Sequence, residues 1–269
     1  MDILITKNNK TISLSEYGIV ATDFNVSSIP LRPIYEELEG RSGTVDYGST
    51  DGTREITVPF YFESHIVEDF SLIRDELFHL IGGKNSFFVT DPRQQSKRYK
   101  VRLSNSFSIE QIYKVGQSEL LFETTELPYA ESINTTSEGI EDYPYRGIPP
   151  VVMNELEYTH TGTSFRIYNA GNVPIHPFQQ ELKITISEVE GSTNYLQLQN
   201  VTNGTPFRVN EGVANQTIVL DGPNITSNGL QYLRNTNKEF IELETGWNDF
   251  ELTGATSAKV EFDFRLYFY

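Results

Sequence analysis

The histidines and carboxylates are the side chains of this sequence with the widest range of chemistry, and their spacing does not assemble a reactive site. The four histidines stand far apart, at His65, His79, His160 and His176. None belongs to a His-Glu-x-x-His pattern or another tight metal-ligand spacing, so we expect structural or surface roles for them. The 37 Asp and Glu residues make chance carboxylate pairs inevitable, but no pattern selects two of them for glycoside hydrolysis.

Sequence motifs for nucleophilic and nucleotide chemistry are missing as well. There is no Gly-x-Ser-x-Gly elbow, no phosphate-binding loop and no Rossmann glycine fingerprint. The chain has no cysteine, which excludes thiolate nucleophiles, zinc-thiolate sites and disulfides. Asp46 and Asp51 stand beside glycines, but the ladder of oxygen ligands that calcium needs is lacking. The sequence therefore predicts a protein that is not an enzyme and has no catalytic, cofactor-binding or metal site.

Aromatic side chains offer one further kind of chemistry, the stacking of a sugar ring on an exposed aromatic ring. Trp247, the only tryptophan, stands in a turn-like Thr-Gly-Trp-Asn-Asp stretch just before a predicted strand. Tyr158, Tyr195 and Tyr232 are the other candidates for glycan stacking. The competing interpretation of Trp247 is a place in the protein core, because large aromatic side chains are mostly buried.

Net charge limits the partners of the 269-residue chain, which carries a formal charge of −16. Such acidity argues against sequence-specific binding of nucleic acid, which needs Lys and Arg to dominate part of the surface. The only basic cluster, Arg93 to Arg102, is short and is interpreted as a solvated hairpin. No stretch approaches the roughly 18 apolar residues of a membrane helix, and no signal peptide is visible, so we expect a soluble protein without a membrane partner.

The stretch from Leu31 to Glu63 is predicted to form two long extended arms joined by a loop. Alternating apolar residues mark the second arm as a half-buried strand, at Ile56, Val58, Phe60 and Phe62. The loop is punctuated by glycines, which suit positive φ values or a close backbone approach, at Gly40, Gly43, Gly48 and Gly52. A loop this long is usually functional, so we predict that the arm projects from its own domain and reaches a neighbouring molecule.

The rest of the first half predicts a sheet-rich α+β domain over residues 1–129. Apolar residues at helical spacing run from Ile66 to Ile81, and Gly82-Gly83 supplies a stop. Hairpin turns are predicted at Lys7-Asn8-Asn9 and at Val115-Gly116-Gln117. From residue 130 to 150 the apolar content falls and prolines accumulate, which is typical of a semi-rigid linker.

Residues 151–269 show short strands separated by turn clusters, as expected of a β-sandwich domain. The clearest strand runs from Lys259 to Tyr269, where apolar and polar residues alternate. Phe240 to Leu243 is another predicted strand. The chain as a whole is therefore predicted to be mostly β with one helix.

The order of these features resembles the distal tail proteins of siphophages, the long-tailed bacteriophages, over nearly the whole chain. The resemblance rests on the β-rich first domain with a single helix and on an arm that ends in Arg54-Glu-Ile-Thr-Val. It also rests on a second domain with Tyr168-Asn-Ala-Gly-Asn-Val-Pro and a final Gly254 to Tyr269 strand. It implies that the first domain carries a projecting belt hairpin and assembles into a hexameric ring. It further implies that the second domain is a galectin-like β-sandwich.

The resemblance implies a structural virion protein that joins the tail tube to the tail-tip or baseplate hub and helps to position host-adhesion proteins. It places the contact with a neighbouring subunit in the belt, at Gly40, Arg41, Gly43, Asp46, Tyr47, Gly48 and Arg54. The implied partners are further copies of the chain, the tail tube protein, the tape-measure protein, the tail-associated lysin or baseplate hub protein, and receptor-binding proteins. The protein would be made in the cytoplasm of the bacterial host and reside at the phage tail tip.

The alternative function comes from the aromatic residues rather than from the arm. In this alternative the protein binds glycans through its second domain and recognises cell-wall carbohydrate of the host, with Trp247 or an exposed tyrosine stacking on sugar.

Overall fold

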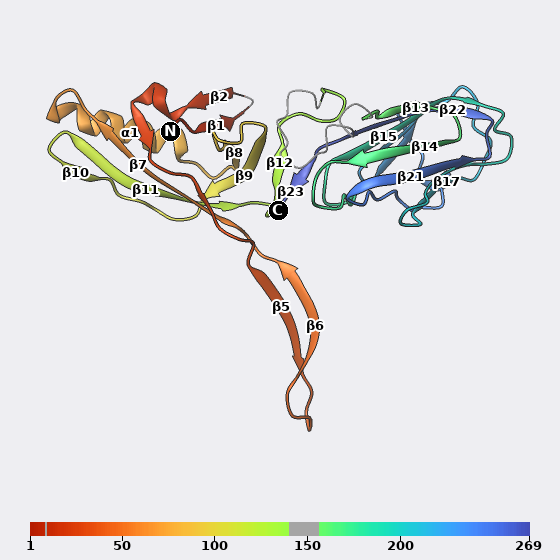
Figure 1. The fold of residues 1–269 in the computed structure, drawn as a ribbon, viewed down its shortest axis with the longest axis horizontal. Coiled ribbons are helices and arrows are strands. Elements are labelled where there is room, and N and C mark those ends of the chain that lie inside the picture. Colours follow the sequence, from red (N-terminus) through yellow and green to blue (C-terminus); the bar gives the residue numbers. More distant parts are fainter. Residues whose placement is uncertain (9, 140–155) are drawn as a thin grey trace. The chain divides into compact units, whose positions relative to one another are not determined.

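The computed structural model describes residues 1–8, 10–139 and 156–269, which form two compact units. The first unit comprises Met1–Ala130 with Tyr269, and the second comprises Glu131–Phe268. Strands dominate both units, and α1 (Phe70–Ile81) is the one α-helix of the described ranges (Figure 1). The predicted fold class, mostly β with one helix, is confirmed. Of the predicted linker, residues 140–150 lie outside the described residues, and residues 130–132 form a strand.

An antiparallel sheet forms the body of the first unit. Its order is β2 (Lys10–Ser13), β1 (Leu4–Lys7), β8 (Phe87–Thr90), β9 (Lys97–Leu103), β11 (Val115–Thr124), β7 (Glu55–Glu63) and β3 (Ile19–Ala21). Two short strands lie beside this path, because β4 (Asn25–Val26) pairs with β7 and β10 (Glu110–Ile112) pairs with β11. The longest ladder joins β7 to β11, from Glu63 opposite Val115 to Glu55 opposite Glu123. The predicted alternation in β7 is confirmed, since Ile56, Val58, Phe60 and Phe62 are all buried.

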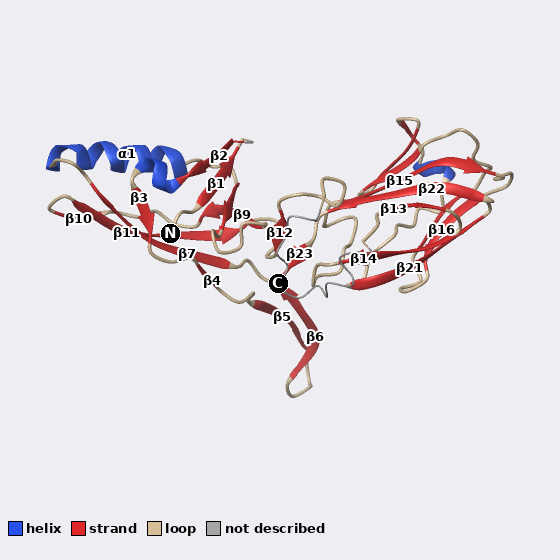
Figure 2. Ribbon diagram, turned by 45° about the horizontal axis from the view of Figure 1, so that its top comes forward, coloured by secondary structure: helices blue, strands red, loops and turns tan. Residues whose placement is uncertain are grey.

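Helix α1 covers one face of this sheet (Figure 2). It buries Phe70, Leu77 and Ile81, and the Phe70 ring centroid lies 5.2 Å from that of Phe62 on β7. The predicted stop after Ile81 is confirmed, while the predicted start is wrong by one turn. A short 3-10 helix, η2 (Val67–Asp69), precedes α1, because the apolar residues before Phe70 face solvent instead of the sheet. Another, η1 (Leu14–Tyr17), follows β2.

Of the two predicted hairpin turns, one lies where it was predicted and the other is displaced. The predicted hairpin at the start of the chain is confirmed by the pairing of β1 with β2. The loop between β10 and β11 is Tyr113-Lys114, however, and not the predicted Val115-Gly116-Gln117. Gly116 lies inside β11, where a Cβ atom would stand 2.5 Å from Cζ of Phe62 and 2.8 Å from Cε2 of Phe70. This glycine therefore serves the packing of the core and not a turn.

The predicted arm is a separate hairpin with different limits. It consists of β5 (Leu31–Glu37) and β6 (Thr44–Asp51), whereas the predicted second arm is β7 of the main sheet. The prediction failed because two glycines do not belong to the loop. Gly48 lies in a β-bulge of β6, and Gly52 lies where the chain returns, with its amide donating to the Pro30 carbonyl at 2.7 Å. A Cβ atom on Gly52 would stand only 2.9 Å from that oxygen.

The second unit contains two antiparallel sheets that pack as a β-sandwich, as predicted. One has the order β13 (Thr159–Thr161), β22 (Ser257–Phe264), β15 (Leu182–Glu190), β18 (Ile218–Asp221), β19 (Asn224–Ser227) and β20 (Leu230–Gln231). The other has the order β14 (Ser164–Asn169), β21 (Gly246–Thr253), β16 (Leu196–Asn200) and β17 (Pro206–Val209). Side chains of both sheets meet in the core, where the ring centroids of Phe250 on β21 and Phe262 on β22 are 4.9 Å apart. A short 3-10 helix, η3 (Leu233–Asn235), follows β20.

Two strand predictions in this unit need correction. Phe240 to Leu243 forms no strand and contributes only an isolated bridge between Leu243 and Ile175. The predicted strand from Lys259 to Tyr269 breaks after β22, and β23 (Tyr267–Phe268) pairs instead with β12 (Ala130–Ser132). The break lies at Arg265, whose guanidinium donates to the carbonyls of Ser132 and Ile133 and to Glu181.

The buried Asn169 accounts for the Asn-Ala-Gly motif of the second unit. Its side-chain amide donates to the Val173 carbonyl at 3.1 Å, and its side-chain oxygen accepts from the Gly171 amide at 3.0 Å. A Cβ atom on Gly171 would stand 2.6 Å from the Tyr267 carbonyl oxygen. The motif therefore closes a tight loop that packs against the last strand.

The packing of Gly116 gives a testable prediction for the first unit. Replacing Gly116 by Ala forces a methyl group against two phenyl rings, and such overpacking costs about 1–3 kcal/mol. We expect urea unfolding of the first unit, followed by circular dichroism, to shift to lower denaturant. Unfolding followed by Trp247 fluorescence should not shift, because the sole tryptophan lies in the second unit.

Gln117→Ala is the matched control, since this exposed neighbour should change stability by less than about 0.5 kcal/mol. Identical circular dichroism midpoints for wild type and Gly116→Ala would contradict the packing argument.

Candidate functional site

The hairpin of β5 and β6 is the most exposed part of the described chain. Its strands pair only with each other among the described residues, and the hairpin extends away from the rest of the first unit (Figure 1). Every residue of β5 is exposed, and β6 has only two positions that are partly covered. An isolated two-stranded hairpin is marginally stable at best in water, so this element lacks the packing that stabilises the other strands.

The hairpin carries apolar side chains on both of its faces. Alternation along β5 places Leu31, Pro33 and Tyr35 on one face and Ile34 on the other. Tyr47 shares the face of Ile34, because its hydroxyl donates to the Glu36 carboxylate at 2.7 Å. Tyr47 is 60% exposed and Tyr35 is 58% exposed. Each face of the hairpin therefore presents uncovered apolar surface to solvent.

The tip and the bulge hold most of the predicted belt residues. Gly40 and Gly43 have φ of 81° and 88°, values that glycine adopts without strain. Arg41 lies between them, and its amide donates to the Leu38 carbonyl at 3.1 Å. The Asp46 carboxylate accepts from the Gly48 amide at 2.8 Å, which fixes the bulge beside Tyr47. All of these residues are exposed.

The base of the hairpin is tied to the first unit through Asp51. The Tyr129 hydroxyl donates to this carboxylate, and the Tyr269 hydroxyl lies 3.5 Å from the same oxygen. The two tyrosine rings also contact each other, with centroids 5.1 Å apart. Burial and the hydrogen bond to Asp51 raise the pKa of Tyr129 far above its usual value. These contacts hold the base of the hairpin while its length stays exposed.

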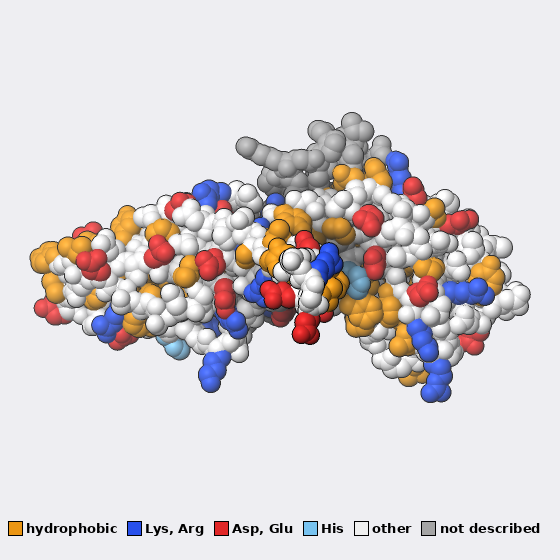
Figure 3. All heavy atoms as spheres, turned by 90° about the horizontal axis from the view of Figure 1, so that it is seen from below, with side chains coloured by type: hydrophobic (Ala, Val, Ile, Leu, Met, Phe, Trp, Pro, Cys, Tyr) orange, Lys and Arg blue, Asp and Glu red, His pale blue; other side chains and the backbone are white. Residues whose placement is uncertain are grey.

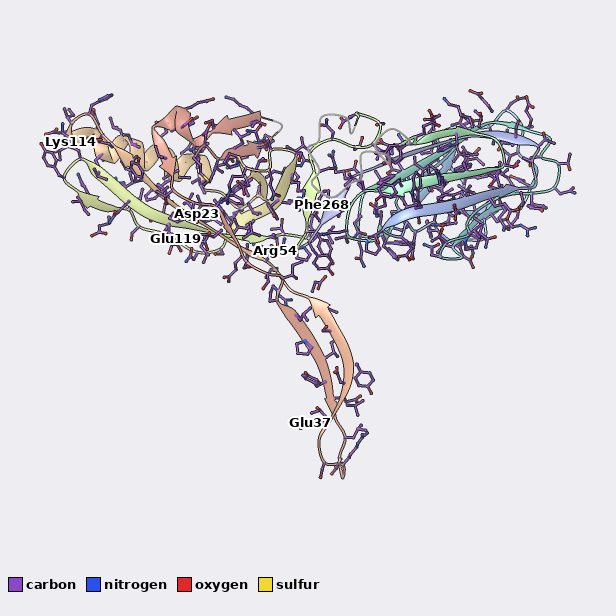
Figure 4. All side chains as sticks on the ribbon, in the orientation of Figure 1. Asp23, Glu37, Arg54, Lys114, Glu119 and Phe268 are labelled. Carbon is purple, nitrogen blue, oxygen red and sulfur yellow. The ribbon has the colours of Figure 1, made fainter. Side chains whose placement is uncertain are left out.

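Arg54 differs from the other predicted belt residues because it is buried. Only 6% of it is exposed, and its amide donates to Oγ1 of Thr124 at 2.9 Å (Figure 4). Within the described residues its Nε atom has no hydrogen-bond partner. A side chain in this position supports the start of β7 and does not form part of the exposed surface.

Sequence reasoning missed four exposed apolar side chains of the hairpin. These are Leu31, Ile34, Tyr35 and Leu38, with 66%, 48%, 58% and 43% exposure. Their signal in the sequence is that apolar residues occur at both odd and even positions of an extended segment, so that neither face is purely polar. In a strand of a buried sheet the same apolar residues would lie in a core. The sequence pattern therefore indicates exposed apolar surface only once β5 and β6 are known to pair with each other alone among the described strands.

The basic cluster of the first unit is largely neutralised by neighbouring carboxylates. Arg93 pairs with Asp91 at 3.0 Å and with Asp23 at 3.4 Å. Two further exposed pairs join β9 to β11 and to the segment after it, Lys100 with Glu126 and Arg102 with Glu123, each at 2.6 Å. Figure 3 shows acidic and basic side chains interspersed on the face seen there. The cluster is therefore not a free cationic surface.

Two of the candidate glycan-stacking residues meet in the second unit, around Tyr168. The Trp247 ring centroid lies 4.9 Å from that of Tyr168, and the Arg166 guanidinium carbon lies 4.1 Å from the Trp247 ring. Tyr158 donates its hydroxyl to the Tyr168 carbonyl at 3.0 Å and packs against Phe264. Trp247 is partly exposed, but a cation and a tyrosine already contact its indole ring.

The other two candidates have separate partners. The Arg208 guanidinium carbon lies 4.4 Å from the ring of Tyr195. The Tyr232 hydroxyl donates to the Glu211 carboxylate, and burial together with this hydrogen bond raises the pKa of Tyr232 to about 12. Hydrogen bonds from Tyr232 and then from Asn235 lower the pKa of Glu211. Tyr195 and Tyr232 are thus engaged within their own unit.

A search of the described residues for two other kinds of site found neither. No three His, Asp or Glu side chains of the described chain lie close enough together to hold a metal ion. No helix in the described ranges is long and apolar enough to cross a membrane.

Residues 8–124 match the family model of the phage tail protein RIFT-related domain. The fold is similar to that of the Dit (gp 19.1) protein of phage SPP1, described as a paradigm of the hub adsorption apparatus in phages that infect Gram-positive bacteria. That similarity has a TM-score of 0.68 at 12% identity and covers 98% of this chain and 99% of the SPP1 chain. The family match and the shared fold confirm the predicted resemblance to siphophage distal tail proteins.

Two structures of the phage p2 baseplate in its activated conformation, one with Sr and one with Ca, also match. Their identities are 10% and 11%, and each match covers 98% of this chain and 97% of the other. Their TM-scores of 0.42 are too low to support an argument. No curated protein sequence matches the chain significantly.

The contact between Tyr232 and Glu211 gives a prediction about pH. The hydrogen bond favours the charged carboxylate, so it contributes stability above the ordinary glutamate pKa and loses it as pH falls through the lowered pKa. We expect Tyr232→Phe to raise the pKa of Glu211 toward 4.5, measured by NMR titration of the side-chain carboxyl carbon. Tyr195→Phe should leave that pKa unchanged. An unaltered Glu211 pKa in Tyr232→Phe would refute the assigned hydrogen bond.

Proposed function

We propose, from the premise that residues 8–124 are a phage tail protein RIFT-related domain, that this chain is a distal tail protein. In this proposal it assembles into a hexameric ring that joins the tail tube to the tail-tip or baseplate hub and helps to position host-adhesion proteins. Its role is structural and not enzymatic. The first domain, residues 1–129, forms the ring, residues 130–150 form the linker, and residues 151–269 form a galectin-like domain.

The observation that carries the proposal is the exposed hairpin of β5 and β6. The ribbon has apolar side chains on both faces and pairs with no further strand of the described chain. It therefore exposes surface that soluble monomers rarely leave uncovered. Its free strand edges also offer backbone groups for pairing with another chain. A second copy would cover this surface, and a closed ring gives every hairpin the same neighbour.

The proposed contact surface follows from the geometry of the hairpin. It includes the tip and bulge residues Gly40, Arg41, Gly43, Asp46, Tyr47 and Gly48, together with the exposed apolar residues Leu31, Ile34, Tyr35 and Leu38. Arg54 is left out of this surface because it is buried.

The ring is proposed to contact the tail tube protein, the tape-measure protein, the tail-associated lysin or baseplate hub protein, and receptor-binding proteins. It is proposed to be made in the cytoplasm of the bacterial host and to reside at the tip of the virion tail.

A charged substitution on the hairpin tests self-association directly. Ile34 is 48% exposed in the single chain, so Ile34→Glu should leave the fold intact but place a carboxylate in the proposed contact. We expect the wild-type chain to have a mass of about six times 30.6 kDa by size-exclusion chromatography with light scattering. The Ile34→Glu chain should be mostly monomeric.

The control for this experiment is Ser106→Glu, an equal change in charge at an exposed position outside the hairpin. It should keep the wild-type mass, and circular dichroism spectra should be the same for all three proteins. A monomeric wild-type chain, or an Ile34→Glu chain that still assembles fully, would contradict the proposal.

Glycan binding by the second domain is the alternative, and the partly exposed Trp247 beside Tyr168 and Arg166 is the feature that supports it. Trp247 is also the only source of tryptophan fluorescence. The structural proposal predicts that host cell-wall polysaccharide leaves this emission unchanged in the full chain. A saturable change that is lost in Tyr168→Ala would favour the alternative, with Tyr61→Ala, at an exposed tyrosine of the first unit, as the control.

A further inference from the structure

A strained tyrosine stands at the far end of the first unit, in the loop between β10 and β11. The loop consists of Tyr113 and Lys114, and Tyr113 has φ of 56°. Glycine, asparagine and aspartate are the usual residues at positive φ in two-residue hairpin loops, because a bulky side chain is strained there. The Tyr113 side chain is 74% exposed, so packing within the unit does little to offset that strain. Its chief contact is Lys114, whose ammonium nitrogen lies 5.8 Å from the ring centre.

Three further exposed apolar residues stand near Tyr113 at this end of the unit, and we call Ile66, Val67, Ile112 and Tyr113 together the tip patch. Exposure of these four residues is 51%, 40%, 53% and 74%. The two chain segments that form it are held together by hydrogen bonds. The Lys114 ammonium group donates to the His65 carbonyl at 2.6 Å, and the Ser64 amide donates to the Lys114 carbonyl at 2.9 Å.

The tip patch lies on a firm base and far along the sheet from the hairpin. Below the loop, Gly116 brings β11 into contact with the packed rings of Phe62 and Phe70. Lys114 and Arg54 mark the two ends of the ladder between β7 and β11 (Figure 4). The patch is therefore a preformed surface separate from the hairpin.

Three exposed acidic residues lie close to the tip patch along the chain. Glu63 stands opposite Val115 in the ladder, Glu68 follows Val67, and Glu110 begins the strand that ends at Ile112. The nearest cation, Lys114, already donates to a backbone carbonyl. An apolar centre with a negative rim fits a partner whose contact surface is apolar and edged by Lys or Arg. The same rim repels nucleic acid.

A second copy of the chain is a poor match for this surface. The basic cluster of the first unit is largely neutralised by its own carboxylates, through Arg93 with Asp91, Lys100 with Glu126 and Arg102 with Glu123. Docking that cluster onto the rim would bring three further carboxylates toward Glu63, Glu68 and Glu110, and like charges brought together disfavour a contact.

We propose that the tip patch docks a different protein, one that offers an apolar surface edged by basic residues. Tyr113 is the anchor of this contact, and its strained backbone is retained because the loop presents the ring to the partner. The contact is separate from the self-association assigned to the hairpin, but it rests on the proposed function, since the partner is sought among the other proteins of the tail.

The substitution Tyr113→Gly separates folding from docking. Glycine relieves the strain at positive φ, so the melting temperature of the full chain should stay the same or rise. The probes are the other structural proteins of the same tail, each purified singly and tested against the immobilised full chain by biolayer interferometry. We expect one basic protein to bind the wild-type chain, to bind Tyr113→Gly at least tenfold more weakly, and to bind more weakly when salt is raised from 50 to 300 mM.

Asn8→Gly is the matched control, because Asn8 also has positive φ, 52°, in a hairpin loop but lies outside the tip patch. It should leave binding unchanged. Val67→Ser tests the patch without altering that loop and should also weaken binding.

Three results would overturn the proposal. A lower melting temperature for Tyr113→Gly would show that the ring serves folding. A reduced oligomeric mass for Tyr113→Gly would show that a second copy occupies the patch. Binding of none of the tail proteins to the wild-type chain, or equal binding to both chains, would show that the patch docks no such partner.

Discussion

The ladder between β7 and β11 is the interaction on which the first unit depends. It runs from Glu63 opposite Val115 to Glu55 opposite Glu123, which spans about 27 Å at the usual rise of about 3.4 Å per residue. One end leads into the exposed hairpin through Arg54, and the other end carries the loop with Tyr113. Because both surfaces are attached to one hydrogen-bonded pair of strands, the ladder sets the distance between them.

Polar, charged and apolar side chains are satisfied to different degrees within this protein. In the described part of the second unit the buried polar side chains are hydrogen-bonded, as where Asn200 donates to Asn248 at 2.9 Å and both are fully buried. Charged side chains of the first unit mostly pair locally, in contacts that are exposed and individually weak. Exposed apolar side chains occur on the hairpin of β5 and β6 and in the tip patch, and others lie on α1 and in the second unit. The hairpin and the tip patch are the two surfaces to which we assign the proposed contacts.

Elements in which apolar residues recur at a regular spacing were predicted correctly from the sequence. Predictions failed where one residue type, glycine, can serve more than one structural purpose. Alternation located β7, and helical spacing located the buried stripe of α1, because periodicity reports directly on burial. Glycine was the main source of error. The sequence places Gly48 and Gly52 in the loop of the arm and Gly116 in a turn. In the structure Gly48 lies in a bulge of β6, Gly52 makes the kind of close backbone approach predicted for the loop but lies outside it, and Gly116 packs against two phenyl rings.

The candidate site was predicted less completely than the fold. The predicted arm, Leu31 to Glu63, contains the hairpin of β5 and β6. The burial of Arg54 depends on β11, which is remote in sequence. The uncovered state of Tyr35 and Tyr47 depends on the lack of a third strand beside β5 and β6 among the described residues. The sequence did not predict Tyr113 in a hairpin loop, because tyrosine does not favour a positive φ. The position of Tyr113 follows only from the pairing of β10 with β11.

The fixed pairing of β7 with β11 also limits how such a chain can change during evolution. Side chains on the outer face of either strand can be replaced singly, whereas one residue inserted into β7 would turn Phe60 or Phe62 from the core to solvent. Variation in length is then restricted to segments beyond the ladder. Two proteins of this fold could therefore lose nearly all likeness in sequence, as at 12% identity, and still keep the same strand length between their two ends.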